Sequence, residues 1–98
     1  MHRDLHPTDG VRYLLERDRE DNGGAFARYR VAIYTRDAVF TGTAMLGDDG
    51  SVELSPTGAP DELHEKLGTI TRLVARDAAK LRADGMPAWP QRILRWRR

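Results

Sequence analysis

Two neighbouring stretches, AFARYRVAIYT (residues 25–35) and AVFTGTAML (residues 38–46), decide the fold class of this chain. In the first stretch, Tyr29, Val31 and Ile33 recur at every second position, and this period in aromatic and β-branched residues predicts a strand. The second stretch follows after only Arg36 and Asp37, so the two strands can pair only antiparallel. The positions between the recurring ones in the first stretch are Arg28, Arg30, Ala32 and Tyr34.

The sequence GDDG (residues 47–50) continues this pattern with a tight turn. Its two glycines can adopt the positive φ that hairpin turns require, and a third short strand is predicted over residues 51–54. Gly42, in the middle of the second strand, indicates a bulge or a close approach of another segment. The centre of the chain is therefore expected to be an antiparallel meander.

A long amphipathic helix is predicted after the loop at residues 55–59. Pro60 fits the first helical position, Asp61 and Glu62 favour the positive end of the helix dipole, and Gly85 followed by Pro87 ends the helix. A helix of about 25 residues is ~37 Å long, more than the width of three strands spaced ~4.8 Å apart. We therefore expect the tail or a second subunit to cover part of its apolar stripe. The stripe consists of Leu63, Leu67, Ile70, Val74, Ala78 and Leu81.

Residues 11–20 allow two interpretations. Val11, Leu14 and Leu15 form one face of a short helix capped by Thr8, and this interpretation is slightly favoured. Val11, Tyr13 and Leu15 also alternate as in a strand, and the polar run at residues 20–24 then becomes a hairpin turn. The fold class is thus α+β: a three- or four-stranded antiparallel meander packed by one long C-terminal amphipathic helix, with a short tail rich in Trp and Arg.

Length and composition exclude several classes of protein. The chain has 98 residues, of which 40% are hydrophobic and 32% charged, and it contains no cysteine. This size fits one domain of a small soluble protein, and the lack of cysteine excludes disulfide scaffolds, thiolate nucleophiles and cysteine-based metal sites. No stretch is apolar enough to span a membrane, so we expect no membrane partner and a cytoplasmic location.

The sequence nominates no catalytic, cofactor or metal site. His2 and His6 have a spacing that shares a helical face, but further ligands for a metal are missing. The glycine pairs at residues 23–24 and 47–50 do not lead into a helix, as a phosphate-binding loop would. We therefore expect no cofactor and doubt that the protein is an enzyme.

The last twelve residues form the most unusual segment of the chain. Residues 87–98 hold both tryptophans and four arginines but no acid, which leaves residues 1–86 with 12 basic and 15 acidic side chains, a net charge of −3. Three segments are expected: a flexible lead-in (1–10), one α+β domain (11–86) and a basic aromatic tail docked on that domain (87–98). Within the tail, a short helix from Pro90 would place Trp89, Ile93 and Trp96 on one side.

Two functions from different classes fit these features. The leading one is a non-catalytic interaction or regulatory module that forms a homo-oligomer and binds a protein partner, because the helix stripe exceeds a three-stranded sheet and no catalytic motif is found. The alternative is a nucleic-acid-binding protein, because arginines contact phosphates and aromatic rings stack on unpaired bases. The candidate residues for binding a partner or nucleic acid are Trp89, Arg92, Arg95, Trp96, Arg97, Arg98, Arg28 and Arg30.

Overall fold

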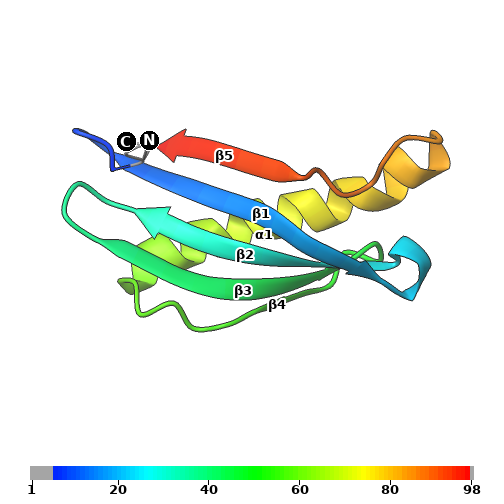
Figure 1. Ribbon diagram of the computed structural model, residues 1–98, viewed down its shortest axis with the longest axis horizontal. Helices are drawn as coiled ribbons and strands as arrows, with labels where there is room; N and C mark the ends of the chain where they lie inside the picture. The colour runs from blue at the N-terminus through cyan, green and yellow to red at the C-terminus, as the bar shows by residue number, and fades with distance from the viewer. Residues whose placement is uncertain (1–5, 98) are drawn as a thin grey trace.

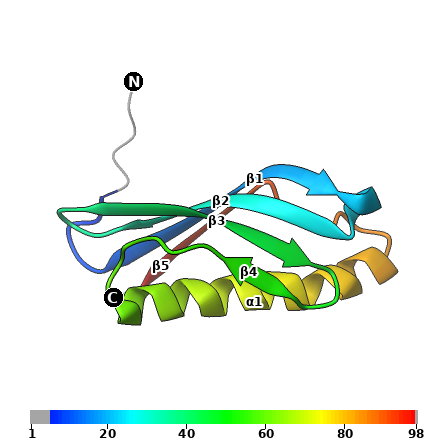
Figure 2. The ribbon, with the colours of Figure 1, turned by 90° about the horizontal axis from the view of Figure 1, so that it is seen from below.

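A computed structural model describes residues 6–97 of the chain, and these form one antiparallel sheet with an α-helix on one side (Figure 1). The strand order is β4-β3-β2-β1-β5. Seen from the edge of the sheet, no helix or strand of residues 6–97 covers the side opposite the helix (Figure 2). The α+β class with an antiparallel sheet is therefore confirmed. The elements in chain order are β1 (Val11–Asp21), the 3-10 helix η1 (Asn22–Gly24), β2 (Phe26–Tyr34), β3 (Val39–Gly47), β4 (Val52–Leu54), α1 (Asp61–Ala83) and β5 (Arg92–Arg97).

The first strand corrects the interpretation of residues 11–20. The helix that was slightly favoured there does not form, because β1 pairs with β2 on one side and with β5 on the other. Leu14 and Leu15 are both buried, although neighbouring residues of a strand point to opposite faces. Two adjacent apolar residues, which on a strand point to opposite faces, therefore gave the same sequence pattern as one face of a helix. The chain then turns through Asn22, Gly23 and Gly24, all at positive φ.

The meander of β2, β3 and β4 follows the predicted alternation. Tyr29, Val31 and Ile33 are buried on the side of the helix, where Tyr29 lies opposite Ala44 of β3. Gly50, at φ 89°, closes the turn into β4. Gly42 marks a close approach: a Cβ added there would lie 2.7 Å from the hydroxyl oxygen of Ser55, whose backbone N–H donates to the carbonyl oxygen of Thr43 in β3.

Helix α1 begins after Pro60 and runs along the long dimension of the sheet (Figures 1 and 2). Because β1, β2 and β3 are nine to eleven residues long, the sheet covers most of the apolar stripe of the helix. Leu67, Ile70 and Ala78 are buried against it, whereas Leu73 lies off the stripe and is exposed. The buried core consists of Tyr13, Leu15, Ala27, Tyr29, Val31, Ile33, Ala44, Leu46, Leu67, Ile70, Ala75, Ala78, Ala88, Trp89 and Ile93.

The end of the chain corrects two further predictions. The long helix is not C-terminal, because residues 92–97 form β5 and pair antiparallel with β1. The short helix considered for the tail is also absent from residues 87–97. Ile93 enters the core from β5, whereas Trp96, three positions on, lies on the opposite face of the strand. The sheet thus has five strands in the described part of the chain.

Candidate functional site

The sheet carries rows of side chains on the face that points away from α1, which we call the open face. Residues paired across neighbouring strands share a face, and Arg12, Leu14 and Glu16 of β1 each pair with one residue of β2 and one of β5. Three rows result. The first is Val39, Tyr34, Arg12 and Trp96; the second is Thr41, Ala32, Leu14 and Leu94; the third is Thr43, Arg30, Glu16 and Arg92.

The open face is unusually apolar for a surface that the described chain leaves uncovered. Val39 is 45% exposed, Leu94 39% and Trp96 45%. The other large hydrophobic side chains that stand exposed in residues 6–97 are Leu73 and Met86, which lie elsewhere. An exposed apolar patch with a polar rim is typical of a surface that binds a partner.

A groove of about 460 Å³ crosses the middle of the open face. Its floor is formed by Leu14 and Ala32, which are buried beneath the longer side chains around them. Tyr34 borders one end, and Arg30 with Glu16 borders the other. The groove exists because the second row has only the small residues Ala32 of β2 and Thr41 of β3 between these longer ones.

Arginine dominates the charge of the open face. Arg12, Arg30 and Arg92 form no ion pair with any residue of 6–97 within 4.0 Å, and Glu16 is the acidic side chain among the three rows. Arg28, in the next row, lies 4.0 Å from Asp18, which offsets its charge. The three rows therefore carry a net charge of +2, from three arginines and one glutamate.

Residues of the lead-in border the first row. The ring of His6 lies edge-on to Tyr34 at 5.3 Å between centroids, and its Nδ1 is 2.7 Å from the carbonyl oxygen of Thr35. The indole Nε1–H of Trp96 donates to the carbonyl oxygen of Asp9 at 2.9 Å. This bond fixes the Trp96 ring while leaving it about half exposed. The remainder of the predicted lead-in, residues 1–5, lies outside the described residues.

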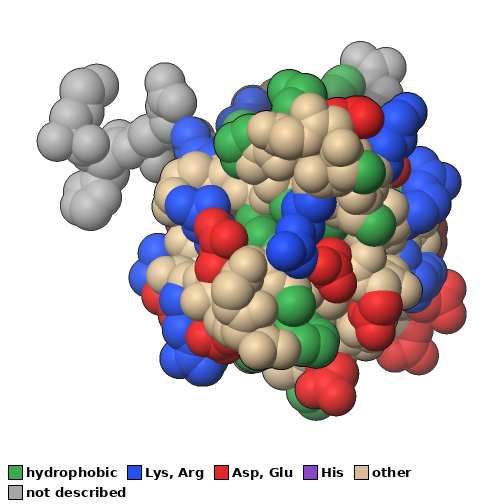
Figure 3. Space-filling view, turned by 90° about the vertical axis from the view of Figure 1, so that its right-hand side faces the viewer, with side chains coloured by type: hydrophobic (Ala, Val, Ile, Leu, Met, Phe, Trp, Pro, Cys, Tyr) green, Lys and Arg blue, Asp and Glu red, His purple; other side chains and the backbone are tan. Residues whose placement is uncertain are grey.

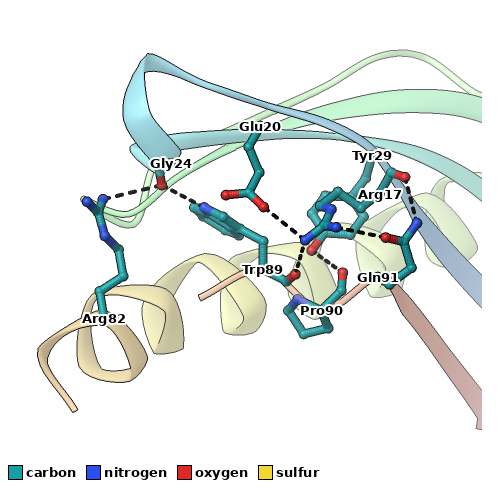
Figure 4. A network of polar contacts seen from close by, with 8 residues as sticks. All are labelled: Arg17, Glu20, Gly24, Tyr29, Arg82, Trp89, Pro90 and Gln91. Carbon is teal, nitrogen blue, oxygen red and sulfur yellow. Dashed lines mark hydrogen bonds and ion pairs between the residues drawn. The ribbon is translucent and has the colours of Figure 1, made fainter. Parts of the chain in front are cut away.

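Trp89 has a different role from Trp96. It is 2% exposed, and its indole Nε1–H donates to the carbonyl oxygen of Gly24 at 2.7 Å (Figure 4). Arg82 at the end of α1 also donates to this carbonyl, at 3.3 Å. Trp89 thus joins the turn after β1 to the segment between α1 and β5. It is a structural residue, and its ring is not available to a partner.

Arg17 of β1 adds further hydrogen bonds to this junction, and we call the cluster of Arg17, Trp89 and Gln91 the anchor. Its guanidinium donates to the carbonyl oxygen of Trp89 and to the side-chain oxygen of Gln91, both at 2.8 Å (Figure 4). Gln91 in turn donates from its amide to the carbonyl oxygen of Arg17 at 3.2 Å. The hydroxyl of Tyr29 donates to the carbonyl oxygen of Pro90 at 2.7 Å. These bonds fix the direction in which the chain enters β5.

Arg95 and Arg97 lie on the other face of β5 from Arg92. The backbone N–H of Arg17 donates to Gln91, so the alternation of an antiparallel pair points the carbonyls of Leu94 and Trp96 toward the free edge of the sheet. The guanidiniums of Arg95 and Arg97 donate to these carbonyls at 3.2 and 2.9 Å. They therefore occupy the acceptors to which another strand would pair. Arg98 lies outside the described residues.

The end of the molecule near η1 has a mixed charge. Acidic and basic side chains are interspersed over this end (Figure 3). Several of them form exposed ion pairs, such as Arg19 with Asp21 and Arg82 with Asp48. This end therefore lacks the excess of arginine found on the open face.

The groups with displaced pKa values lie away from the groove. Burial raises the pKa of Tyr29 to about 12, with smaller opposing effects of Arg17 and Glu20. Burial also raises the pKa of Tyr13, whose hydroxyl has no hydrogen-bond partner among residues 6–97. Both tyrosines belong to the core. A hydrogen bond from Ser51 lowers the pKa of Asp49 on an exposed turn.

Residues 6–97 contain no group of three His, Asp or Glu side chains placed to hold a metal ion.

The open face unites candidates from distant parts of the sequence and adds new ones. It places Arg30 of β2 on the same face of the sheet as Arg92 and Trp96 of β5, although these residues come from distant parts of the sequence. It adds Arg12, Leu14, Glu16 and Tyr34, which were not among the candidate site residues predicted from the sequence. The signal for the β1 residues was present: a strand with Val11, Tyr13 and Leu15 on one face must carry Arg12, Leu14 and Glu16 on the other.

Comparisons with protein-family models, curated proteins and solved structures give no match for this chain. The helices within residues 6–97 are too short or too polar to cross a membrane. What the site can do must therefore be argued from its own side chains.

Proposed function

We propose that this protein is a small non-catalytic interaction module and that a partner binds on the open face of its sheet. The observation that carries the proposal is the set of three rows opposite α1. They combine exposed apolar side chains, a groove and three arginines without an ion-pair partner in residues 6–97. A surface of this composition loses exposed apolar area when a partner covers it.

The placement of the titratable groups supports a binding role over a catalytic one. Catalysis by acid and base requires groups with displaced pKa values that converge on a cleft. The groove has Arg30 and Glu16 at one end, whereas Tyr13 and Tyr29, whose pKa values are raised, are buried in the core. The groove can thus hold and orient a ligand.

A second copy of the chain and an unrelated protein are both partners that this module could take. Leu94 and Leu73 provide a matched pair of variants, because they are 39% and 44% exposed and lie on opposite sides of the molecule. If copies associate through the open face, Leu94→Asp should weaken association about tenfold or more, since a carboxylate is costly to bury in an apolar contact. Leu73→Asp should leave association unchanged.

Sedimentation equilibrium from low to high micromolar concentration measures both variants, and far-UV circular dichroism confirms that each is folded. Association that depends on Leu73 and not on Leu94 would contradict the proposal, because it would place the binding surface on α1. A wild-type chain that is monomeric throughout removes the second copy as partner. The open face must then bind a different molecule.

A further inference from the structure

The net positive charge of the open face favours an anionic partner over a second copy of the chain. Its rows hold Arg12, Arg30 and Arg92 against Glu16 alone. Two copies stacked face to face would each bring a net charge of +2 to the interface, and like charges across an interface are unfavourable. The face therefore complements an anionic molecule better than it complements itself.

The arrangement of these arginines matches a ligand that alternates anionic and planar apolar groups. Arg30 and Arg92 flank Glu16 in the third row, two strands and hence ~10 Å apart, and Arg12 lies four residues along the sheet, ~13 Å away. Between them lies the apolar second row with its groove over Ala32. Cationic groups thus border an apolar floor on two sides.

The aromatic residues of the first row suit unpaired bases. Trp96 is about half exposed and is fixed by its bond to Asp9, so that it presents a rigid aromatic ring. Tyr34 stands across Arg12 from it, at the border of the groove. Aromatic rings on a basic surface bind single strands because every base can stack on them.

We propose that the open face binds single-stranded nucleic acid, with a base on Trp96, a neighbouring base in the groove beside Tyr34, and phosphates at Arg12, Arg30 and Arg92. This inference rests on the proposed function and names the partner of the same surface. A duplex fits less well, because its bases are already stacked and α1, the element that could enter a major groove, lies on the other side of the sheet.

Strand β5 offers a matched test of this proposal. Arg92 and Arg95 are both exposed arginines of one strand, but Arg92 belongs to the open face and Arg95 points to the other. Binding of a labelled oligothymidylate to the intact chain is followed by fluorescence anisotropy over a series of salt concentrations. Three phosphate contacts predict that log K falls by about 2 for each tenfold rise in salt, at ~0.7 per contact with a single strand.

The proposal expects Arg92→Gln to weaken binding several-fold and to lower the salt slope by about 0.7, and Arg95→Gln to change neither. Trp96→Ala should weaken binding about tenfold or more through lost stacking. Equal effects of the two arginine variants would overturn the proposal, because the tail would then act as a basic segment without regard to face. A duplex that binds as tightly as the single strand, or no binding at low salt, would also overturn it.

Polyglutamate, titrated in parallel, separates this proposal from the proposed function. If polyglutamate binds with dependence on Arg92 and not Arg95 while oligothymidylate does not bind, the partner is an acidic protein segment: the open face is a binding surface, and the nucleic-acid proposal is wrong. If neither polymer distinguishes Arg92 from Arg95, and Leu94→Asp behaves as Leu73→Asp in sedimentation, both proposals are wrong.

Discussion

The tail is part of the fold rather than an appendage, and Trp89 is the residue on which this statement can be tested most severely. The variant Trp89→Ala removes a large ring that is 2% exposed and packed in the core, together with the donor to the carbonyl oxygen of Gly24.

The expected loss follows from these contacts. Truncation of a buried Trp to Ala costs about 3–5 kcal/mol, which includes the cavity that it leaves. The lost indole hydrogen bond belongs near the lower end of its usual ~0.5–1.5 kcal/mol, because Arg82 still donates to Gly24. We therefore expect a loss of about 4 kcal/mol. That is a large part of the ~5–15 kcal/mol typical of a domain of this size.

The assay is thermal and urea unfolding followed by far-UV circular dichroism, which does not depend on tryptophan fluorescence. Trp89→Ala should lower the Tm by roughly 20 °C or prevent folding. Trp89→Phe, which keeps a ring but no donor, should lose about 1–2 kcal/mol. Trp96→Ala is the control, and its half-exposed ring predicts a loss of about 1 kcal/mol. A Trp89→Ala protein no less stable than Trp96→Ala would refute the account of the anchor.

Three further predictions concern the core and the sheet. Because the folded-state pKa of Tyr29 is about 12 and its ordinary value is 10.0, the folded protein holds this proton more tightly than the unfolded chain. Stability should therefore fall as pH rises from 10 to 12, by about 3 kcal/mol. Urea unfolding across this window should show a smaller fall in Tyr29→Phe. A chain that ends at Met86 lacks Trp89, Ile93 and β5, and should fail to give a cooperative thermal transition; a stable truncated domain would contradict this. Gly42→Val should cost about 1–3 kcal/mol, because even a Cβ there would lie 2.7 Å from the hydroxyl oxygen of Ser55. An unchanged urea midpoint would show that the loop after β4 moves aside without cost.

The meander and the long helix could be predicted because their signals are local. The alternation of Tyr29, Val31 and Ile33 reflects one buried face, and the turn at Gly50 has the positive φ expected of it. The end of α1 was also predictable, since Gly85 adopts φ 74° directly after the helix. In each case neighbouring residues determine the structure.

The differences between prediction and structure, in residues 11–20 and in residues 92–97, have a common physical cause. For residues 11–20 the sequence slightly favours a helix over a strand, because Val11, Leu14 and Leu15 could form one helical face. Leu14 and Leu15 are both buried because β1 is an interior strand and longer side chains of the open face partly cover Leu14. Residues 92–97 form a strand only because β1 has a free edge beside them. Pairing between segments about eighty residues apart leaves no local pattern.

The basic and aromatic character of the candidate site could be predicted from the sequence, but not which residues form it. The tail was recognised as basic and aromatic, yet its alternation as a strand sends Arg92 and Trp96 to the open face and Ile93 into the core. The partners of Arg92 on that face, Arg12 above all, became apparent only once β1 and β5 were seen to be paired.

The binding of a partner to the open face can be measured directly through the two indole groups. In a ¹H–¹⁵N spectrum of the intact chain titrated with oligothymidylate, we expect the Trp96 indole signal and the amide signals of β1 from Arg12 to Glu16 to shift together. The Trp89 indole signal, buried in the anchor, should stay in place. Shifts that gather on α1, or that move both indole signals equally, would contradict the account.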